Sequence, residues 1–240
     1  MHLRLVLLLL LAHAGVSLAQ TEAPKAPAAE DAKPSPTGGE FGRLIGEAQQ
    51  LSFQQRFFEA LDRLHQAEKL KPDHPTVHNV RGSVHTGMRD FEKARESFTK
   101  AQALNPAAFE PKFNLTELDY VTGDYAKAEA GFTKLLTEFP KLPLEVRHLT
   151  QFKVLVCQLK QQKVAEAEAG MKGFTFMDDT AAYYYAKAAF CFQKGEKGEA
   201  SDWVTKAQKI FKPIENAPYL DSLMEARWIA SLTVPDDPKK

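Results

Sequence analysis

Three histidines lie close enough in the sequence to share one face of a helix. His78 follows His74 by four residues, and His85 follows His78 by seven, so in a helix their side chains would project from similar sides. Imidazole nitrogens bind zinc, and Asp73 would be a further ligand. The alternative is that His78 and His85 pack between helices. We favour packing and predict no metal site.

Two cysteines, Cys157 and Cys191, are the whole thiol complement of the chain. They fall in what we predict to be neighbouring helices, which pack about 8–10 Å apart. A disulfide needs Cα atoms about 5.5–6 Å apart, although an exported protein would permit oxidation. We expect two buried thiols, and a disulfide stays the alternative. Two cysteines do not support a metal cluster.

The remaining chemical motifs are weak. Asn114-Leu115-Thr116 has the pattern of a glycosylation acceptor, but it falls inside a predicted helix, so we interpret it as a chance match. The sequence has no glycine-rich phosphate loop and no nucleophile elbow, and no residue set offers a nucleophile, a base and an orienting group together. We therefore predict that the protein is not an enzyme and that it needs no cofactor.

Charge and composition are those of an ordinary soluble chain. The 240 residues are 44% hydrophobic, and 31 basic residues balance 31 acidic ones. A core can therefore be buried, but no basic field gathers nucleic acid or anionic membrane. These values argue against a nucleic-acid partner.

The N-terminal 40 residues contain two predicted segments outside the fold. Residues 1–19 resemble a signal peptide, with Arg4, an apolar run over residues 5–12, and Ser17-Leu18-Ala19 before a cleavage point. The apolar run is shorter than the ~20 residues that span a bilayer, so we expect an exported protein, periplasmic or secreted, with no stable membrane anchor. Residues 20–40 are rich in proline and alanine, which predicts a disordered linker.

The elements that position these residues are revealed by a period of 34 residues. An alanine, an apolar residue and a proline recur with the same internal spacing. A fixed period of this length indicates a solenoid of small units, each of which buries its apolar face only against its neighbours. The matching triplets are Ala60, Leu64 and Pro72; Ala94, Phe98 and Pro106; and Ala128, Phe132 and Pro140.

This pattern resembles the tetratricopeptide repeat, a helix–turn–helix family of 34-residue period. The small residue of the first helix is also present, as Ala48, Gly82 and Thr116. The family's tryptophan and tyrosine positions depart from the pattern, and His78 and His85 stand at two of them. The resemblance implies an all-α fold, an α-solenoid of helix–turn–helix repeats.

The repeats are expected to be uneven toward the C-terminus. The fourth is degenerate, with its second-helix alanine at Ala167. The fifth is expected to be capped by Asp178-Asp179-Thr180 and to turn at Gly195-Glu196. Pro218 is expected to open a C-terminal capping helix that carries Trp228. The predicted segments are repeat 1 at 41–74, repeat 2 at 75–108, repeat 3 at 109–142, repeat 4 at 145–178, repeat 5 at 181–214 and the capping helix at 218–232.

In the resembled family the first helices build a concave groove, and this implies a partner-binding surface here. The alternative is that some of these side chains fill the core between repeats. The function that we predict is an exported adaptor or scaffold that binds a peptide segment or partner protein. The alternative function is a structural protein that self-associates through the solenoid ends. The implied groove residues are Asn79, Ser83, Phe113, Glu117, Tyr120, Phe152, Tyr185 and Phe192.

Overall fold

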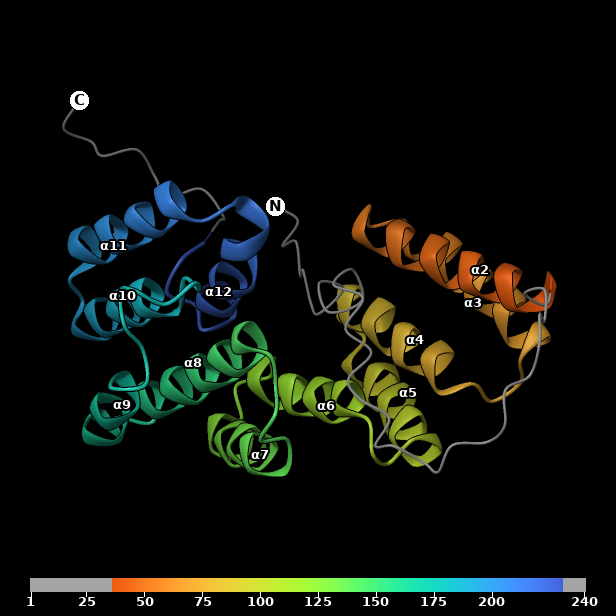
Figure 1. Ribbon diagram of the computed structural model, residues 1–240, viewed down its shortest axis with the longest axis horizontal. Helices are drawn as coiled ribbons and strands as arrows, with labels where there is room; N and C mark the ends of the chain where they lie inside the picture. The colour runs from red at the N-terminus through yellow and green to blue at the C-terminus, as the bar shows by residue number, and fades with distance from the viewer. Residues whose placement is uncertain (1–35, 231–240) are drawn as a thin grey trace, which may run out of the picture. The chain divides into compact units, whose positions relative to one another are not determined.

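The structure is a computed structural model that describes residues 36–230, and this part of the chain consists of helices without strands (Figure 1). It divides into two compact units, which meet at Asn114 and Leu115 inside helix α6. The predicted signal peptide and residues 20–35 lie outside the described residues. The helices are α2 Pro36–Phe53, α3 Phe57–Leu70, α4 Pro75–Gly87, α5 Phe91–Leu104, α6 Phe109–Val121, α7 Tyr125–Glu138, α8 Leu144–Lys160, α9 Val164–Met171, α10 Ala182–Lys194, α11 Lys197–Ile210 and α12 Pro213–Glu225.

The helices from α2 to α11 form five pairs, and the two helices of every pair are joined by the same type of turn. In each turn a single residue adopts a left-handed conformation, and the next backbone N–H donates to a carbonyl five residues earlier at 2.9 Å. This is the bond that closes a Schellman helix end. It satisfies a terminal carbonyl and reverses the chain, so each pair is antiparallel. The left-handed residues are Gln55, Arg89, Gly123, Gln162 and Gly195.

The periodic alanines confirm the predicted architecture. Each second helix carries its alanine on its buried face. All five alanines are fully buried, and so is the apolar residue four positions later in the first three repeats, because the i and i+4 positions share a face. The alanines are Ala60, Ala94, Ala128, Ala167 and Ala200.

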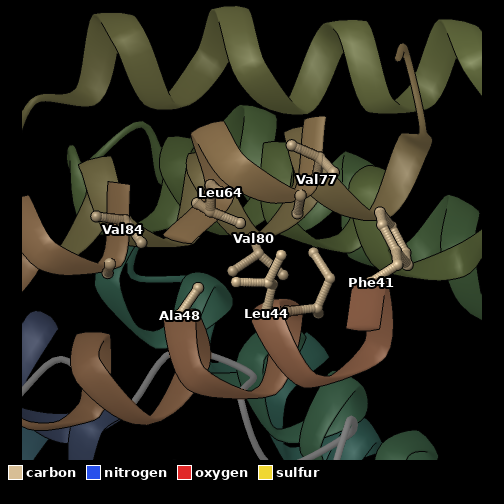
Figure 2. Packing of buried hydrophobic residues seen from close by; sticks show 10 residues of the cluster. Phe41, Leu44, Ala48, Leu64, Val77, Val80 and Val84 are labelled. Carbon is tan, nitrogen blue, oxygen red and sulfur yellow. The ribbon is translucent and has the colours of Figure 1, made fainter. Parts of the chain in front are cut away.

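The core of the N-terminal unit lies between α2, α3 and α4 (Figure 2). Figure 2 shows Leu64 of α3 among Leu44 and Ala48 of α2 and Val77 and Val80 of α4, and all five are buried. The burial of these apolar side chains is the main driving force that holds the first repeat on the second.

Small residues in the first helices are required by close packing, as predicted. A Cβ atom added to Gly82 would lie 2.5 Å from the ring of Phe98, which is fully buried. In the third repeat the close approach is reversed, because a Cβ added to Gly131 of α7 would lie 2.6 Å from Thr116 of α6. At Gly82 and Gly131 the helices of a pair therefore pack so closely that a side chain of one helix lies against the backbone of the other.

One predicted helix start and one predicted helix cap are wrong. Helix α2 begins at Pro36 rather than Phe41, so it includes the last residues of the predicted linker; proline suits a first helical turn because it lacks an N–H that would need a partner. Helix α10 begins at Ala182, and no side chain caps it. Asp178 instead accepts a hydrogen bond from the backbone N–H of Thr175 at 2.7 Å, which closes the preceding turn.

The last helix also begins earlier than predicted. It starts at Pro213 and contains Pro218 in its interior. Pro213 lies at the end of the segment predicted for repeat 5, 181–214, but it occupies the first turn of α12. The helix ends at Glu225, and Trp228 follows it in a turn with left-handed Arg227.

Candidate protein-binding face

In the N-terminal unit, the structure places three of the implied groove residues on the first helices of repeats 2 and 3. Asn79 and Ser83 of α4 are half-buried. The Asn79 Oδ1 accepts a hydrogen bond from the Asn114 amide at 3.0 Å, and the Ser83 hydroxyl donates to the Asn79 carbonyl at 3.3 Å. Phe113 is buried, with its ring 5.4 Å from that of Phe109. Asn79 and Ser83 are therefore the solvent-accessible part of this set.

In the C-terminal unit, the structure brings the other five groove residues to one face, but helix α12 covers it. We call this the α12-contact face. Its residues come from the part of α6 after Asn114 and from α8 and α10, which are the first helices of their repeats. Side chains on it contact α12 or the turn that follows α12, directly or through one neighbour. The face consists of Glu117, Tyr120, Phe152, Lys153, Lys160, Tyr185 and Phe192.

Tyr219 of α12 lies among the aromatic residues of this face. Its ring stacks on Tyr185 at 5.2 Å with an interplanar angle of 13°, and it meets Phe152 edge-on at 5.2 Å. The Tyr185 hydroxyl donates to the Asn216 Oδ1 at 3.0 Å. Burial raises the pKa of both phenols, so both remain neutral donors at physiological pH.

Lys153 forms a buried polar centre on the same face. Its ammonium group donates to Glu117 Oε1 at 2.7 Å and to the Ser222 hydroxyl at 2.9 Å, and it lies 4.6 Å from the centre of the Tyr120 ring. The Tyr120 hydroxyl donates to the backbone carbonyl of Ser222 at 2.6 Å. The side chains of this ion pair are only 5% and 3% exposed. Removal of one partner from such a pair strongly destabilises the folded protein, because the other charge stays buried without a partner.

Lys160 contacts the C-terminal end of α12. Its ammonium group donates to the Ala226 carbonyl at 2.9 Å and lies 5.2 Å from the centre of the Trp228 ring. That ring also stacks with Phe192 at 6.2 Å. A cation near the last carbonyls of a helix is favourable because these carbonyls lack partners within the helix and carry partial negative charge. Burial lowers the pKa of Lys160.

These positions correct the expectation of an open groove in the C-terminal unit. Glu117, Tyr120, Phe152 and Tyr185 are buried, and Phe192 is half-buried. The grouping of these side chains follows the prediction, whereas their exposure does not, because α12 lies over them. The C-terminal helix was expected to cover the end of the last repeat. It does contact both helices of the last repeat, and with the turn that follows it extends over the first helices of three repeats, from Tyr120 of α6 to Phe192 of α10.

Sequence reasoning missed Lys153 and Lys160. They lie seven residues apart on α8, so they share a helix face, and Lys153 directly follows the predicted Phe152. The seven-residue spacing of the two lysines was the only feature of the sequence that could have indicated a shared role. It was not decisive because lysines at this spacing are typical of solvated helix faces, and only the position of α12 distinguishes the two cases.

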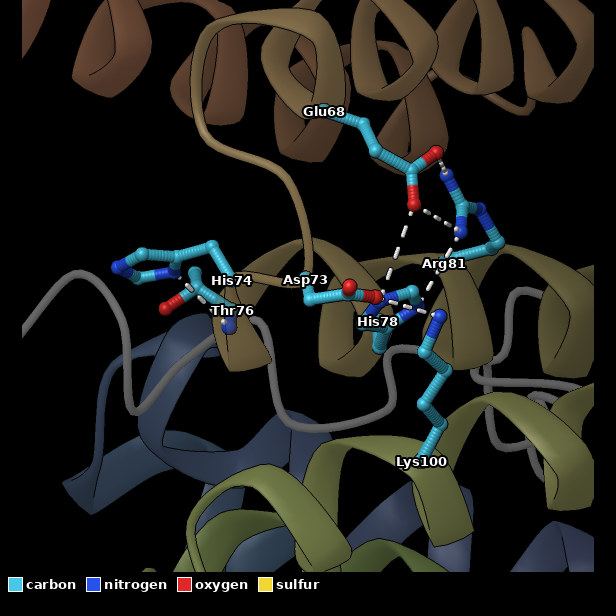
Figure 3. Close-up of polar contacts among 7 residues, drawn as sticks. All are labelled: Glu68, Asp73, His74, Thr76, His78, Arg81 and Lys100. Carbon is cyan, nitrogen blue, oxygen red and sulfur yellow. Dashed lines mark hydrogen bonds and ion pairs between the residues drawn. The ribbon is translucent and has the colours of Figure 1, made fainter.

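His74 and His78 occupy separate environments (Figure 3). His74 accepts a hydrogen bond from the backbone N–H of Thr76, and its ring contacts Phe41. His78 is buried, with Nε2 at 3.8 Å from carboxylate oxygens of both Glu68 and Asp73. Burial lowers the pKa of the imidazoles of His74, His78 and His85. The contacts of His74 and His78 are those of packing residues.

The carboxylates around His78 are bound by cations from other helices (Figure 3). Arg81 of α4 donates to Glu68 of α3 at 2.8 Å, and Lys100 of α5 lies 2.7 Å from Asp73 in the preceding loop. The hydrogen bond from Arg81 is the main cause that lowers the pKa of Glu68. This cluster connects the second helix of repeat 1 with both helices of repeat 2.

Among the described residues, one group has the geometry of a potential metal site. Cys191 Sγ and carboxylate oxygens of Glu196 and Glu199 lie within 4.8 Å of one another, but both carboxylates are exposed. Burial raises the pKa of the Cys191 thiol, and the neighbouring carboxylates raise it further. Exposed acidic groups are common without an ion, so this group by itself does not establish a metal centre.

The two thiols and the glycosylation motif are buried. Cys157 and Cys191 are free, as expected, and no disulfide joins them. Asn114 is only 1% exposed, and its amide donates to Asn79, so the folded chain does not present it as an acceptor. None of the helices within residues 36–230 combines the length and apolar character needed to cross a membrane.

Comparison with known proteins supports the repeat assignment. Residues 45–109 and 85–143 match the model of the tetratricopeptide repeat family. These segments cover the second and third repeats completely and most of the first. No curated protein matches the chain.

Two solved structures resemble the chain in fold. One is a thermophilic tetratricopeptide repeat protein of Thermus thermophilus, 18% identical, with a TM-score of 0.57, covering 77% of this chain and 99% of that one. The other is PilW, described as a widely conserved type IV pilus biogenesis factor, 21% identical, with a TM-score of 0.58, covering 78% of this chain and 89% of that one. The fold is thus an α-solenoid of tetratricopeptide-type repeats.

Proposed function

We propose that the protein is an exported, non-enzymatic adaptor that binds a peptide segment or a partner protein on the first helices of its repeats. The observation that carries this proposal is the α12-contact face. There, side chains from the first helices of three repeats hold a helical segment through aromatic contacts and through hydrogen bonds to its backbone carbonyls. A surface that holds one helix in this way has the chemistry to hold another.

The accessible residues of the N-terminal unit extend this proposal. Asn79 and Ser83 are half-buried, so they keep polar atoms near solvent. Amide and hydroxyl groups on a rigid helix suit hydrogen bonding to an extended peptide, whereas buried aromatic anchors supply most of the binding energy in typical interfaces. We assign the polar contacts with a partner to Asn79 and Ser83.

Export is part of the proposal and rests on the signal-peptide pattern of residues 1–19. Cell fractionation of the full chain tests it, because cleavage after Ala19 gives a shorter product outside the cytoplasm. A full-length product in the cytoplasm would contradict export. The likeness to PilW at 21% identity concerns the fold, so we propose no role in pilus biogenesis.

Photo-crosslinking tests the binding surface. A photoreactive residue would be placed at Asn79 or Ser83 in the full chain and, as a control, at the exposed Gln66 on the second helix α3. We expect Asn79 and Ser83 to crosslink to the same protein in the cells of origin, and Gln66 not to do so. Crosslinks from Asn79 and Ser83 to a second copy of the chain alone would favour the self-associating structural protein instead.

A further inference from the structure

We propose that α12 with its following turn is a releasable occupant of the α12-contact face, and that a partner helix of the same chemistry replaces it. This inference rests on the proposed function and specifies both the partner and its regulation. The partner helix would carry a tyrosine, a hydroxyl residue three positions later and an aromatic residue beyond its C-terminal turn. In α12 and its following turn these are Tyr219, Ser222 and Trp228.

The first argument is that part of the recognition is directed at the backbone at the end of a helix. Tyr120 donates to the Ser222 carbonyl and Lys160 donates to the Ala226 carbonyl, at 2.6 and 2.9 Å. Both acceptors are backbone atoms at the C-terminal end of α12. The Ser222 carbonyl also accepts from the Ala226 N–H at 3.0 Å, whereas the Ala226 carbonyl lies beyond the last helical residue, Glu225. Any helix that ends at this place would present the same acceptors.

The second argument is that two aromatic contacts select the side chains of the occupant. Tyr219 packs between Phe152 and Tyr185, and the indole of Trp228 lies against Phe192 and the Lys160 ammonium group. Aromatic anchors enclosed in this way commonly dominate the energy of an interface. The two sites lie at opposite ends of the contact, so they also fix the direction of the bound helix.

The third argument concerns the polarity of the face. Apart from its aromatic rings, it presents Glu117, Lys153, Lys160 and two tyrosine hydroxyl groups. A permanently covered contact gains little from a buried ion pair, because apolar residues of similar volume are often as stable. A face that alternates between covered and open states needs groups that water can solvate. The Lys153–Glu117 pair, at 2.7 Å, lies entirely within the face, so it persists when α12 leaves.

The connection between α11 and α12 permits this release. Phe211 and Lys212 are the only residues between the two helices, and Lys212 is exposed, as are Pro213, Ile214 and Glu215 in the first turn of α12. Burial of α12 begins at Asn216, whose amide donates to the carbonyls of Phe211 and Lys212. Rotation about this connection would move the buried part of the helix without disturbing α11.

A fluorescent peptide with the sequence of residues 212–230 tests the proposal in trans. Its binding to the full chain would be followed by anisotropy. We expect weak binding to the wild type and at least tenfold tighter binding to Tyr219→Ala, which weakens the internal occupant and leaves the face intact. The control Tyr183→Ala changes a tyrosine of α10 that packs on Trp203, outside the face, and should bind like the wild type. Adding Lys160→Met to Tyr219→Ala should remove most of the gain.

Hydrogen exchange of the wild type gives a measurement that needs no variant. We expect the amides of α12 to exchange at least tenfold faster than those of α8, because release of α12 exposes them without opening α8. Equal exchange rates, or no gain in peptide affinity by a folded Tyr219→Ala chain, would overturn the proposal. A dimer of Tyr219→Ala that exchanges α12 between copies would assign the face to a second copy and overturn the partner helix.

The peptide-binding experiment and the crosslinking experiment test the two proposals separately. Peptide binding needs no cellular partner, and crosslinking at Asn79 and Ser83 does not require release of α12. Failure of the peptide experiment alone would leave the adaptor function standing with α12 as a fixed part of the fold. Failure of crosslinking alone would leave a helix-binding face whose occupant is α12.

Discussion

Substitution of Gly82 tests the packing between the helices of one repeat. Gly82 lies in α4, and the nearest atoms to an added Cβ are Cδ1 and Cε1 of Phe98, both at 2.5 Å. Phe98 is fully buried in α5, so its ring cannot turn into solvent to make room. Gly82→Ala must therefore displace the ring or move α4 away from α5.

Two opposing effects determine the magnitude for Gly82→Ala. Alanine is favoured over glycine inside a helix by about 1 kcal/mol, whereas overpacking a core costs about 1–3 kcal/mol. The net expectation is a loss of about 1 kcal/mol for Gly82→Ala and a larger loss for Gly82→Leu. For a chain of this size, 1 kcal/mol corresponds to a shift in melting temperature of about 2–4 °C.

Thermal and urea unfolding of Gly82→Ala beside Gly46→Ala would measure this effect. Gly46 lies in α2 with nothing within 4 Å of an added Cβ, so its substitution should stabilise by about 1 kcal/mol. The two variants are thus expected to shift stability in opposite directions. Phe98→Leu should reduce the loss caused by Gly82→Ala, as a double-mutant cycle would show. A Gly82→Ala protein stabilised like Gly46→Ala would refute the packing argument.

Three further predictions concern titration, the face and the thiols. Stability should fall as the pH drops below about 6.5. Burial lowers the pKa of His78 and His148 in the folded state below the unfolded value, so the unfolded chain binds more protons in this range. Melting curves at about pH 7.5 and 5.5 should show a smaller loss for His148→Asn than for the wild type. Tyr120→Phe removes one of two donors to the Ser222 carbonyl, so urea unfolding should show a loss of about 1 kcal/mol, and unchanged stability would mean that the bond from the Ala226 N–H is sufficient. Cys157 should react with iodoacetamide only after denaturation, since burial raises its pKa, and native labelling detected by mass spectrometry would contradict this.

The period of 34 residues made most of the fold predictable. Alanine at the close approach of two helices, an apolar residue four positions later and a small residue in the first helix are local requirements of the packing, and the structure confirms them at Ala60, Leu64 and Gly82. Such requirements act between neighbouring helices of one pair. They can be recognised in a single sequence because the same contact is repeated.

Helix boundaries and caps were less predictable, since several residue types satisfy a helix end. Thr180 was expected to cap α10, but its hydroxyl group bonds to the Nδ1 of His148 at 2.7 Å, a partner 32 residues away. Pro213 was assigned to the end of a repeat, although proline suits the first turn of a helix equally well. A long-range partner decides the first case, and the course of the following chain decides the second.

The position of α12 could not be predicted, because the repeat pattern describes pairs and α12 is not paired within the described residues. It ends as the first helices do, with left-handed Arg227 and a 3.0 Å bond from the Trp228 N–H to the Leu223 carbonyl. A first helix that continues into a second one is held at its stacking position by the alanine contact of its own pair. Without that contact, α12 is placed by whichever surface buries it best.

The first helices of the preceding repeats offer Phe152 and Tyr185 for Tyr219 and two cationic side chains for the polar groups of α12. The same side chains that the resemblance assigned to a partner thus hold the last helix of the chain, which is why their grouping could be predicted while their burial could not.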